Sequence, residues 1–207
     1  MTSYTQETVE CPHCQAAMTI LALRSCNTFG ATFYTDGHVE GAMYDETCRL
    51  NTCPACGKYF WLEDAKPRTD DDDRAGAADE LFPPAEGVRD EGYETALRAR
   101  PWTSREQELY LRIRVWWWSN MPYRDQSAKR INVAEHDKAN LMRLLELLDE
   151  NDANHRLMRA EIYRQLGLFE QAIEELGDDF DDRYGLAARR IRELAERRET
   201  RVQPIDV

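Results

Sequence analysis

The stretch RLNTCPACGKYFWLED, residues 49–64, contains a tight Cys-x-x-Cys pair, Cys53 and Cys56, followed by a short aromatic run. A second pair with the same spacing, Cys11 and Cys14, lies in the stretch CPHC near the start of the chain. Each pair presents two thiolates on one side of a tight turn, and two pairs supply the four soft ligands that tetrahedral zinc prefers. The spacing therefore predicts one Zn²⁺ per chain, bound by Cys11, Cys14, Cys53 and Cys56.

Four thiolates fill the coordination shell of such an ion, so no position remains for a catalytic water. We therefore expect the metal to have a structural role. The alternative is a redox-active dithiol, but a thioredoxin-type motif has one pair in a βαβ setting, which this sequence lacks. The other two cysteines, Cys26 and Cys48, have no matching pair and are expected to be half-buried thiols.

Short strands are expected between and after the two pairs. Residues 18–25 are apolar, and residues 30–44 contain two β-prone runs on either side of an Asp-Gly dipeptide (residues 36–37), which suits a tight hairpin turn. Residues 58–63 predict one more strand. Together with the cysteine spacing, these patterns predict a small zinc-ribbon β domain over residues 1–64.

The composition changes after this region. Residues 65–93 combine an acidic run with small residues and a Pro-Pro pair, which is typical of an exposed acidic linker. Helical spacing of apolar residues then predicts an all-α domain over residues 94–207, so the overall class is α+β. The first long helix is expected to open with a capping box at Thr103 and Glu106 and to end at Pro122.

One segment of the helical region, AEIYRQLGLFEQAIEEL (residues 160–176), resembles a tetratricopeptide helix pair. Small residues in such a pair let two helices approach closely, and a glycine turns the chain between them. The match ends at Tyr184, where the family has a proline, and only one such unit is present, whereas solenoids usually need about three. The positions that carry the resemblance are Ala160, Tyr163, Leu166, Gly167, Phe169, Ala172 and Leu176.

A further resemblance begins at the stretch SCNTFGA, residues 25–31. It is similar to an S-x-N-T-F-G-A segment in a group of uncharacterised bacterial proteins, in which a zinc ribbon precedes a helical domain. The resemblance covers most of residues 11–63 and, more loosely, the helices. It implies an architecture and a bacterial setting, but no activity.

Three consecutive tryptophans, Trp116, Trp117 and Trp118, lie on the first long helix. Successive helical residues rotate by about 100°, so the three cannot share one face. Trp116 and Trp117 can flank the apolar face, and Trp118 must then point elsewhere. Two interpretations follow: packing between helices or domains, or, together with Tyr123, anchoring of a protein partner.

The charge restricts the class of partner. The formal net charge is −12, and nearly all of the excess lies in the first half of the chain. Such acidity repels phosphate backbones and favours basic partners. No apolar run is long enough to span a bilayer and no secretory signal is visible, so we expect a cytoplasmic protein without a membrane segment.

The sequence favours a non-enzymatic module that binds a protein partner, either as an adaptor or as an immunity-type protein that neutralises a basic toxin. No phosphate-binding loop, nucleophile elbow or histidine–carboxylate zinc motif is present. The alternative is a nucleic-acid-binding ribbon, for which the basic residues Arg24, Arg49 and Lys58 make a poor phosphate footprint. A third interpretation is an enzyme whose site lies among helical residues 135–137, Glu135, His136 and Asp137.

Overall fold

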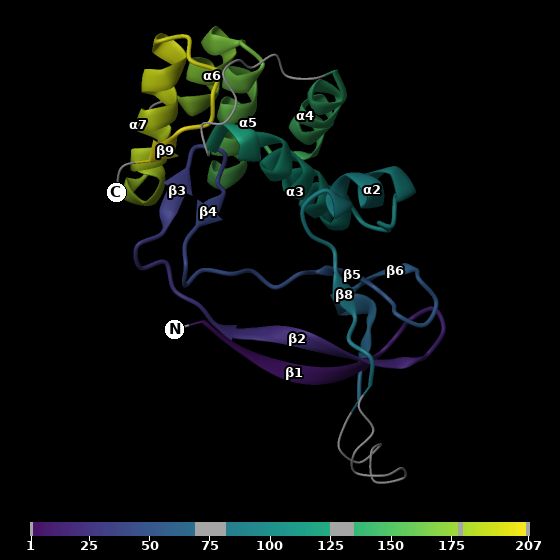
Figure 1. Cartoon of the computed structure of the whole chain (residues 1–207). Helices are drawn as coiled ribbons and strands as arrows, with labels where there is room; N and C mark the ends of the chain where they lie inside the picture. The colour runs from purple at the N-terminus through teal and green to yellow at the C-terminus, as the bar shows by residue number, and fades with distance from the viewer. Residues whose placement is uncertain (1, 69–81, 125–134, 178–179, 206–207) are drawn as a thin grey trace. The chain divides into compact units, whose positions relative to one another are not determined.

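The structure is a computed structural model of mixed α+β class, as the sequence predicts (Figure 1). Strands predominate in the first part of the chain, and six α-helices lie in the described residues after it. The residues that the structure describes are 2–68, 82–124, 135–177 and 180–205.

The chain divides by its contacts into two compact units. The first comprises residues 1–30 and 41–101, and the second comprises residues 31–40 and 102–207. This division differs from the boundary at residue 64 that the sequence suggests, because a ten-residue stretch between the two cysteine pairs belongs with the helices.

Two three-stranded antiparallel sheets form the first unit, with strand orders β2-β1-β7 and β6-β5-β8. The ends of the expected linker are therefore strands that pair within this unit, and residues 69–81 lie outside the described residues. The elements are β1 (Ser3–Glu10), β2 (Ala17–Ser25), β5 (Leu50–Thr52), β6 (Tyr59–Trp61), a 3₁₀ turn (Leu62–Asp64), β7 (Lys66–Pro67), β8 (Glu86–Gly87) and α2 (Gly92–Ala99).

The core of the first unit lies on one face of the β1–β2 hairpin. Val9 pairs with Met18 across the two strands, and both side chains are buried together with Ile20 and Phe60. The first cysteine of each pair belongs to the same cluster. Cys11 and Cys53 thus lie in the small core, whereas the second cysteine of each pair is exposed.

In its described residues, the second unit combines five helices with a small sheet of order β4-β3-β9. In this sheet Phe33 pairs with Ile205, so the β3–β4 hairpin and the end of the described chain lie side by side (Figure 1). The elements are β3 (Thr32–Tyr34), β4 (Val39–Glu40), α3 (Arg105–Arg124), α4 (Glu135–Leu147), α5 (Ala153–Gln165), α6 (Phe169–Leu176), α7 (Asp182–Glu196) and β9 (Pro204–Ile205).

The hairpin turn forms at residues 36–37, as the sequence predicts. Gly37 has φ +82°, which is the left-handed region that glycine adopts without strain. The Asp36 carboxylate accepts a hydrogen bond from the His38 backbone N–H at 3.1 Å, a side-chain turn typical of aspartate.

The start of α3 differs from the prediction by one position. Ser104 Oγ accepts from the Gln107 N–H at 3.2 Å, and the Gln107 side chain accepts from the Thr103 N–H at 2.8 Å. The N-cap is therefore Ser104 rather than Thr103, and Gln107 takes the place expected for Glu106, although its side chain reaches back to the N–H of Thr103, one residue before the cap. The helix also continues to Arg124, two residues beyond Pro122.

Helices α5 and α6 pack against each other in the segment that was expected to form a helix pair. Gly167, between them, has φ +78°, and Ala160, Ala172 and Leu176 are fully buried where the two helices approach. Leu176 and Ala160 also share a buried cluster with Ile191 of α7. The helix pair is thus part of a three-helix packing arrangement.

Candidate metal centre

The two Cys-x-x-Cys turns have the same backbone structure. In the first, the Gln15 N–H donates to the Cys11 carbonyl at 2.9 Å, and in the second, the Gly57 N–H donates to the Cys53 carbonyl at 2.9 Å. The residue after each second cysteine has a positive φ, 62° at Gln15 and 68° at Gly57. The local sequence therefore builds the same tight turn twice, each with two sulphur atoms on one side.

The four sulphur atoms converge on one point. All lie within 4.8 Å of one another, with Cys11 Sγ 3.9 Å from Cys56 Sγ and Cys14 Sγ 3.8 Å from Cys53 Sγ. A zinc ion with bonds of about 2.3 Å to four tetrahedral sulphurs would hold them about 3.8 Å apart. The spacing of this cluster therefore fits a tetrahedral metal ion bound by all four predicted ligands.

The sulphurs differ in how readily they ionise. Burial raises the pKa of the Cys53 thiol, but hydrogen bonds from the Cys56 and Ala55 backbone N–H groups lower it to about 7. A backbone hydrogen bond from Ala16 lowers the pKa of Cys14, but desolvation and hydrogen bonds with the other three cysteines raise it to about 11. Four thiolates at this spacing repel one another, so a divalent cation is needed to keep all four ionised.

Hydrogen bonds of His13 connect the cysteine cluster to the backbone around it. The His13 N–H points at Cys11 Sγ at 3.4 Å, and the His13 ring nitrogen Nε2 lies 2.9 Å from the Tyr59 carbonyl. His13 therefore joins the first turn to β6 and is not among the four groups that converge. Cys11 and Cys53 are buried, whereas Cys14 is exposed.

The two other cysteines lie outside this cluster. The Cys48 sulphur lies 3.1 Å from the carbonyl oxygens of both Leu50 and Val88, which share its single S–H donor. It packs so closely against Gly87 that an added Cβ there would lie 3.0 Å from the sulphur. Cys26 is exposed, in contrast to the half-buried position expected from the sequence.

The three tryptophans occupy different environments. Trp116 is 2 % exposed and donates from its ring N–H to Gln165 at 3.0 Å. Trp117 is half-buried, donates to the Asp36 carbonyl at 2.9 Å and packs edge-on against His38. Trp118 is half-buried. These positions of Trp116 and Trp117 correspond to packing within the second unit.

The two remaining sets of candidate residues also belong to the second unit. Tyr123 is half-buried, and burial together with the charge of Asp137 raises the pKa of its phenol. Asp137 accepts from Ser119 Oγ at 2.8 Å. The side chains of Glu135 and His136 lie outside the described residues, so the third interpretation of the sequence is untested at these positions.

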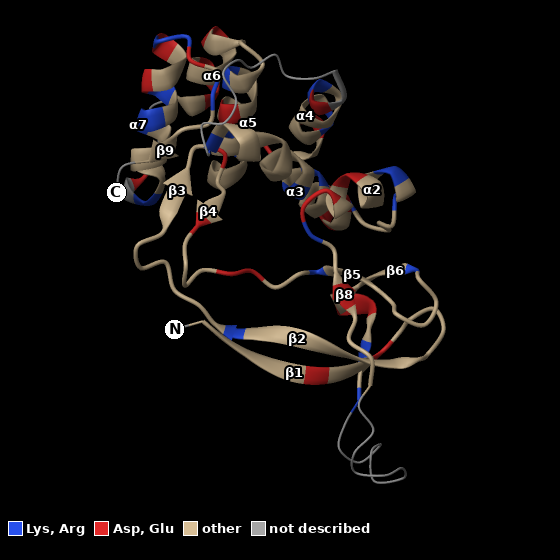
Figure 2. Ribbon diagram, viewed as in Figure 1, with Lys and Arg blue, Asp and Glu red and all other residues tan. Residues whose placement is uncertain are grey.

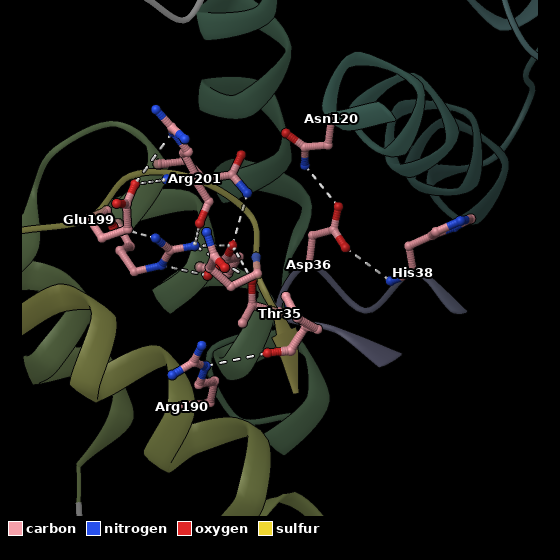
Figure 3. Close-up of polar contacts among 12 residues, drawn as sticks. Thr35, Asp36, His38, Asn120, Arg190, Glu199 and Arg201 are labelled. Carbon is pink, nitrogen blue, oxygen red and sulfur yellow. Dashed lines mark hydrogen bonds and ion pairs between the residues drawn. The ribbon is translucent and has the colours of Figure 1, made fainter. Parts of the chain in front are cut away.

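A buried polar network, which no sequence pattern predicts, connects the hairpin to the helices of the second unit (Figure 3). The Asp36 carboxylate is fully buried and accepts from Asn120 at 2.8 Å and from Arg124. Next to it, Thr35 Oγ1 donates to Glu161 at 2.8 Å. Each charged group of this network therefore has a partner of opposite charge or a hydrogen bond.

Comparisons with family models, curated proteins and solved structures found no match to this chain. The resemblances seen in the sequence therefore remain expectations about architecture. In the part of the chain that the structure describes, none of the helices combines the length and the apolar character needed to cross a membrane.

Proposed function

We propose that this protein is a non-enzymatic module that binds a basic protein partner and whose first unit is held in shape by one structural Zn²⁺. The observation that carries the proposal is the complete set of four converging sulphurs, which all lie within 4.8 Å of one another, with two of the distances between the turns at 3.8 and 3.9 Å. Zinc suits such a soft tetrahedral donor set, and four thiolates leave it no open position for a substrate or a reactive water. The metal then supports a surface rather than a reaction.

The disposition of the carboxylates supports a non-catalytic role. Three carboxylates are buried in the described part of the chain, and each of them, Asp36, Glu108 and Glu161, forms an ion pair with arginine. Arg143 and Arg112, for example, lower the pKa of Glu108 to about 2, although burial opposes them. A catalytic acid or base needs a pKa near the working pH, and this carboxylate is far from it.

The charge of the first unit supports a protein partner over nucleic acid. Arg24 lies 3.3 Å from Glu7, and Arg49 lies 2.6 Å from Glu63, so each of these arginines is already paired with a carboxylate. A nucleic-acid-binding ribbon needs cations free to meet phosphate. A basic protein, by contrast, is attracted by the net negative charge of the chain. Neutralisation of a basic toxin is one specific form of this proposal.

The experiment uses the intact zinc-loaded protein as bait in an extract of its source organism. Metal analysis should find one zinc per chain, and the bait should retain a specific protein that binds in a defined ratio when purified. The Cys53→Ser variant is the matched control and should lose both zinc and partner. Recovery of no protein partner, or tight binding to DNA or RNA at physiological salt, would contradict the proposal.

A further inference from the structure

A small cavity lies in the second unit, between helices α3, α4 and α5 and the segment that leads into β9. Its volume is about 20 Å³, which is room for one group of the size of a water molecule. Part of the described lining is buried, including Trp116, Asn120 and Gln165. The other part is half-buried and forms the rim, with Ser119, Tyr123, Asp137 and Thr200. The cavity is therefore closed at its base and open to solvent at its rim.

The side-chain nitrogen atoms on the described lining are all in use as donors. Each of them donates a hydrogen bond of 2.8–3.0 Å to another group of the protein. The pairs are Trp116 with Gln165, Gln165 with Glu161, Asn120 with Asp36, and Asn140 with the Arg112 carbonyl. The nitrogen atoms of the lining are thus committed to the protein itself.

Three oxygen atoms of the lining are in the opposite situation. Within the described residues, Asn120 Oδ1, Tyr123 Oη and Thr200 Oγ1 make no hydrogen bond. Asn120 is 5 % exposed, and its orientation is fixed, because the Asp36 carboxylate can only accept and so must face the amide nitrogen. The amide oxygen therefore faces away from Asp36 (Figure 3). A buried acceptor without a donor is costly, so this cavity suits a ligand that donates hydrogen bonds.

The charge on the lining is negative. Asp137 is the only ionisable carboxylate on its described part, and neither lysine nor arginine is found there. Asp137 has a further interaction besides that with Ser119, yet its charge acts on the neighbouring phenol: burial and the charge of Asp137 raise the pKa of Tyr123. Acidic and basic residues are interspersed on the helices of this unit (Figure 2), so the lining rather than the general surface favours a cationic donor.

The size of the cavity distinguishes between cationic groups. The ammonium group of lysine is a single nitrogen with three N–H donors at the end of a flexible aliphatic stem, whereas the guanidinium group of arginine is a larger planar fork. A space for one water-sized group admits the ammonium and excludes the guanidinium. The apolar side chains of Leu141 and Val202, also on the lining, suit the aliphatic stem.

We propose that this cavity binds the ammonium group of a lysine side chain of the protein partner. The ammonium would donate to the three free oxygens of Asn120, Tyr123 and Thr200, and the stem would pack against Leu141 and Val202. This inference rests on the proposed function and deepens it, because it names the basic residue that is recognised and the place where it binds.

The probe is n-butylammonium, which has the side chain of lysine, titrated into the intact zinc-loaded protein. Binding should shift the side-chain amide signals of Asn120 in nitrogen-15 NMR spectra. n-Butanol has the same length without the charge and should bind at least about tenfold more weakly. n-Butylguanidinium should also bind at least about tenfold more weakly, because its head group is too large. Equal affinity for butanol would overturn the assignment of a cation, and equal affinity for the guanidinium would overturn the assignment of lysine.

Two variants remove the free hydroxyls. Tyr123→Phe and Thr200→Val should each weaken binding of butylammonium about tenfold but leave the free energy of unfolding unchanged, because neither hydroxyl makes a hydrogen bond within the described chain. Tyr59→Phe, which removes a half-buried hydroxyl of the first unit, is the matched control and should bind as the wild type does. Helical circular dichroism checks that each variant is folded. Unchanged binding by both cavity variants would overturn the proposal.

A third variant tests the charge. Asp137→Asn retains an acceptor for the Ser119 hydroxyl, which lies 2.8 Å from the carboxylate, but removes the negative charge. It should reduce the preference for butylammonium over butanol about fivefold or more. An unchanged preference would overturn the role assigned to the charge of the lining.

Three further outcomes separate this inference from the proposed function. If the native partner binds Tyr123→Phe as tightly as the wild type, the cavity is not its site, although the protein remains a binding module. If butylammonium binds but the bait retains no protein, the proposed function fails, and with it the assignment of a partner lysine. If ammonium chloride binds as tightly as butylammonium, the stem contributes nothing, and the cavity is a site for a free ion instead.

Discussion

The side chains of Glu161 and Arg164 are both fully buried and are joined by two hydrogen bonds, of 2.8 and 2.5 Å. Arg164 also donates to the carbonyls of Glu199 and Arg201, the latter at 2.8 Å. One arginine of α5 therefore fixes the segment that leads into β9. On the other side of the pair, Thr35 brings the β3–β4 hairpin to the same carboxylate.

Replacing Arg164 by methionine should destabilise the second unit by about 3–5 kcal/mol, because Glu161 would then be a buried charge without a counter-ion. The measurement is urea unfolding followed by helical circular dichroism. The control is Arg198→Met, which removes an ion pair to Glu170 whose two side chains are 66 % and 76 % exposed. That change should have little effect. A loss below about 1 kcal/mol in the Arg164 variant would contradict the role assigned to the pair.

The carboxylate of Glu108 should make stability depend on acid pH. Arg143 and Arg112 lower its pKa to about 2 against the opposing effect of burial, and its usual value is 4.5. The stabilisation is therefore fully present above about pH 4.5 and is lost as the pH falls towards 2, at most about 3 kcal/mol.

The measurement for Glu108 is the free energy of unfolding between pH 6 and pH 2.5. The Glu108→Gln variant should lose this part of the pH dependence, because glutamine does not titrate. Glu146→Gln is the matched control, since Glu146 also pairs with Arg143 but is 65 % exposed. Parallel pH curves for Glu108→Gln and the wild type would show that the ion pairs do not stabilise the fold.

The four metal-binding candidates could be predicted from the sequence because two Cys-x-x-Cys pairs encode their own local geometry. The hairpin turn at Gly37 and the α5–α6 pair could be predicted for the same reason, because each depends on residues that are close together in the sequence. Strand β1 was not predicted, although Tyr4, Thr5, Thr8 and Val9 are strand-forming residues. Buried and exposed residues do not alternate regularly along it, so it lacks the two-residue period by which a strand is recognised in a sequence.

The placement of the hairpin could not be predicted, because it depends on contacts distant in sequence. Asp36 meets Arg124, 88 positions later, and Thr35 meets Glu161, 126 positions later. A short hairpin between the two Cys-x-x-Cys turns gives no local sign of such partners. For the same reason the tryptophans could not be assigned from periodicity alone, since Trp117 is oriented by the Asp36 carbonyl.

Removal of the metal should therefore unfold the chain selectively. In the Cys53→Ser variant, or after zinc chelation, amides of β1, β2 and β5 should lose protection from hydrogen exchange, because the core around Val9 and Phe60 contains Cys11 and Cys53. The amides of Tyr34 and Thr35 should stay protected, since they donate to His38 and Gln203. Simultaneous loss of protection in the hairpin would show that it depends on the zinc site.

Two glycines should respond in opposite ways to substitution by alanine. Gly57 has φ +68° in the second metal turn, so Gly57→Ala should cost about 1 kcal/mol and weaken zinc binding about fivefold, as measured by competition with a chromogenic chelator. Gly185 lies inside α7 with open space around it, so Gly185→Ala should stabilise the second unit by about 0.5–1 kcal/mol without changing zinc affinity. Gln15 has the equivalent backbone conformation in the first turn, so the loss at Gly57 should be moderate rather than complete. Unchanged zinc affinity in Gly57→Ala would show that the positive φ is not required for the turn.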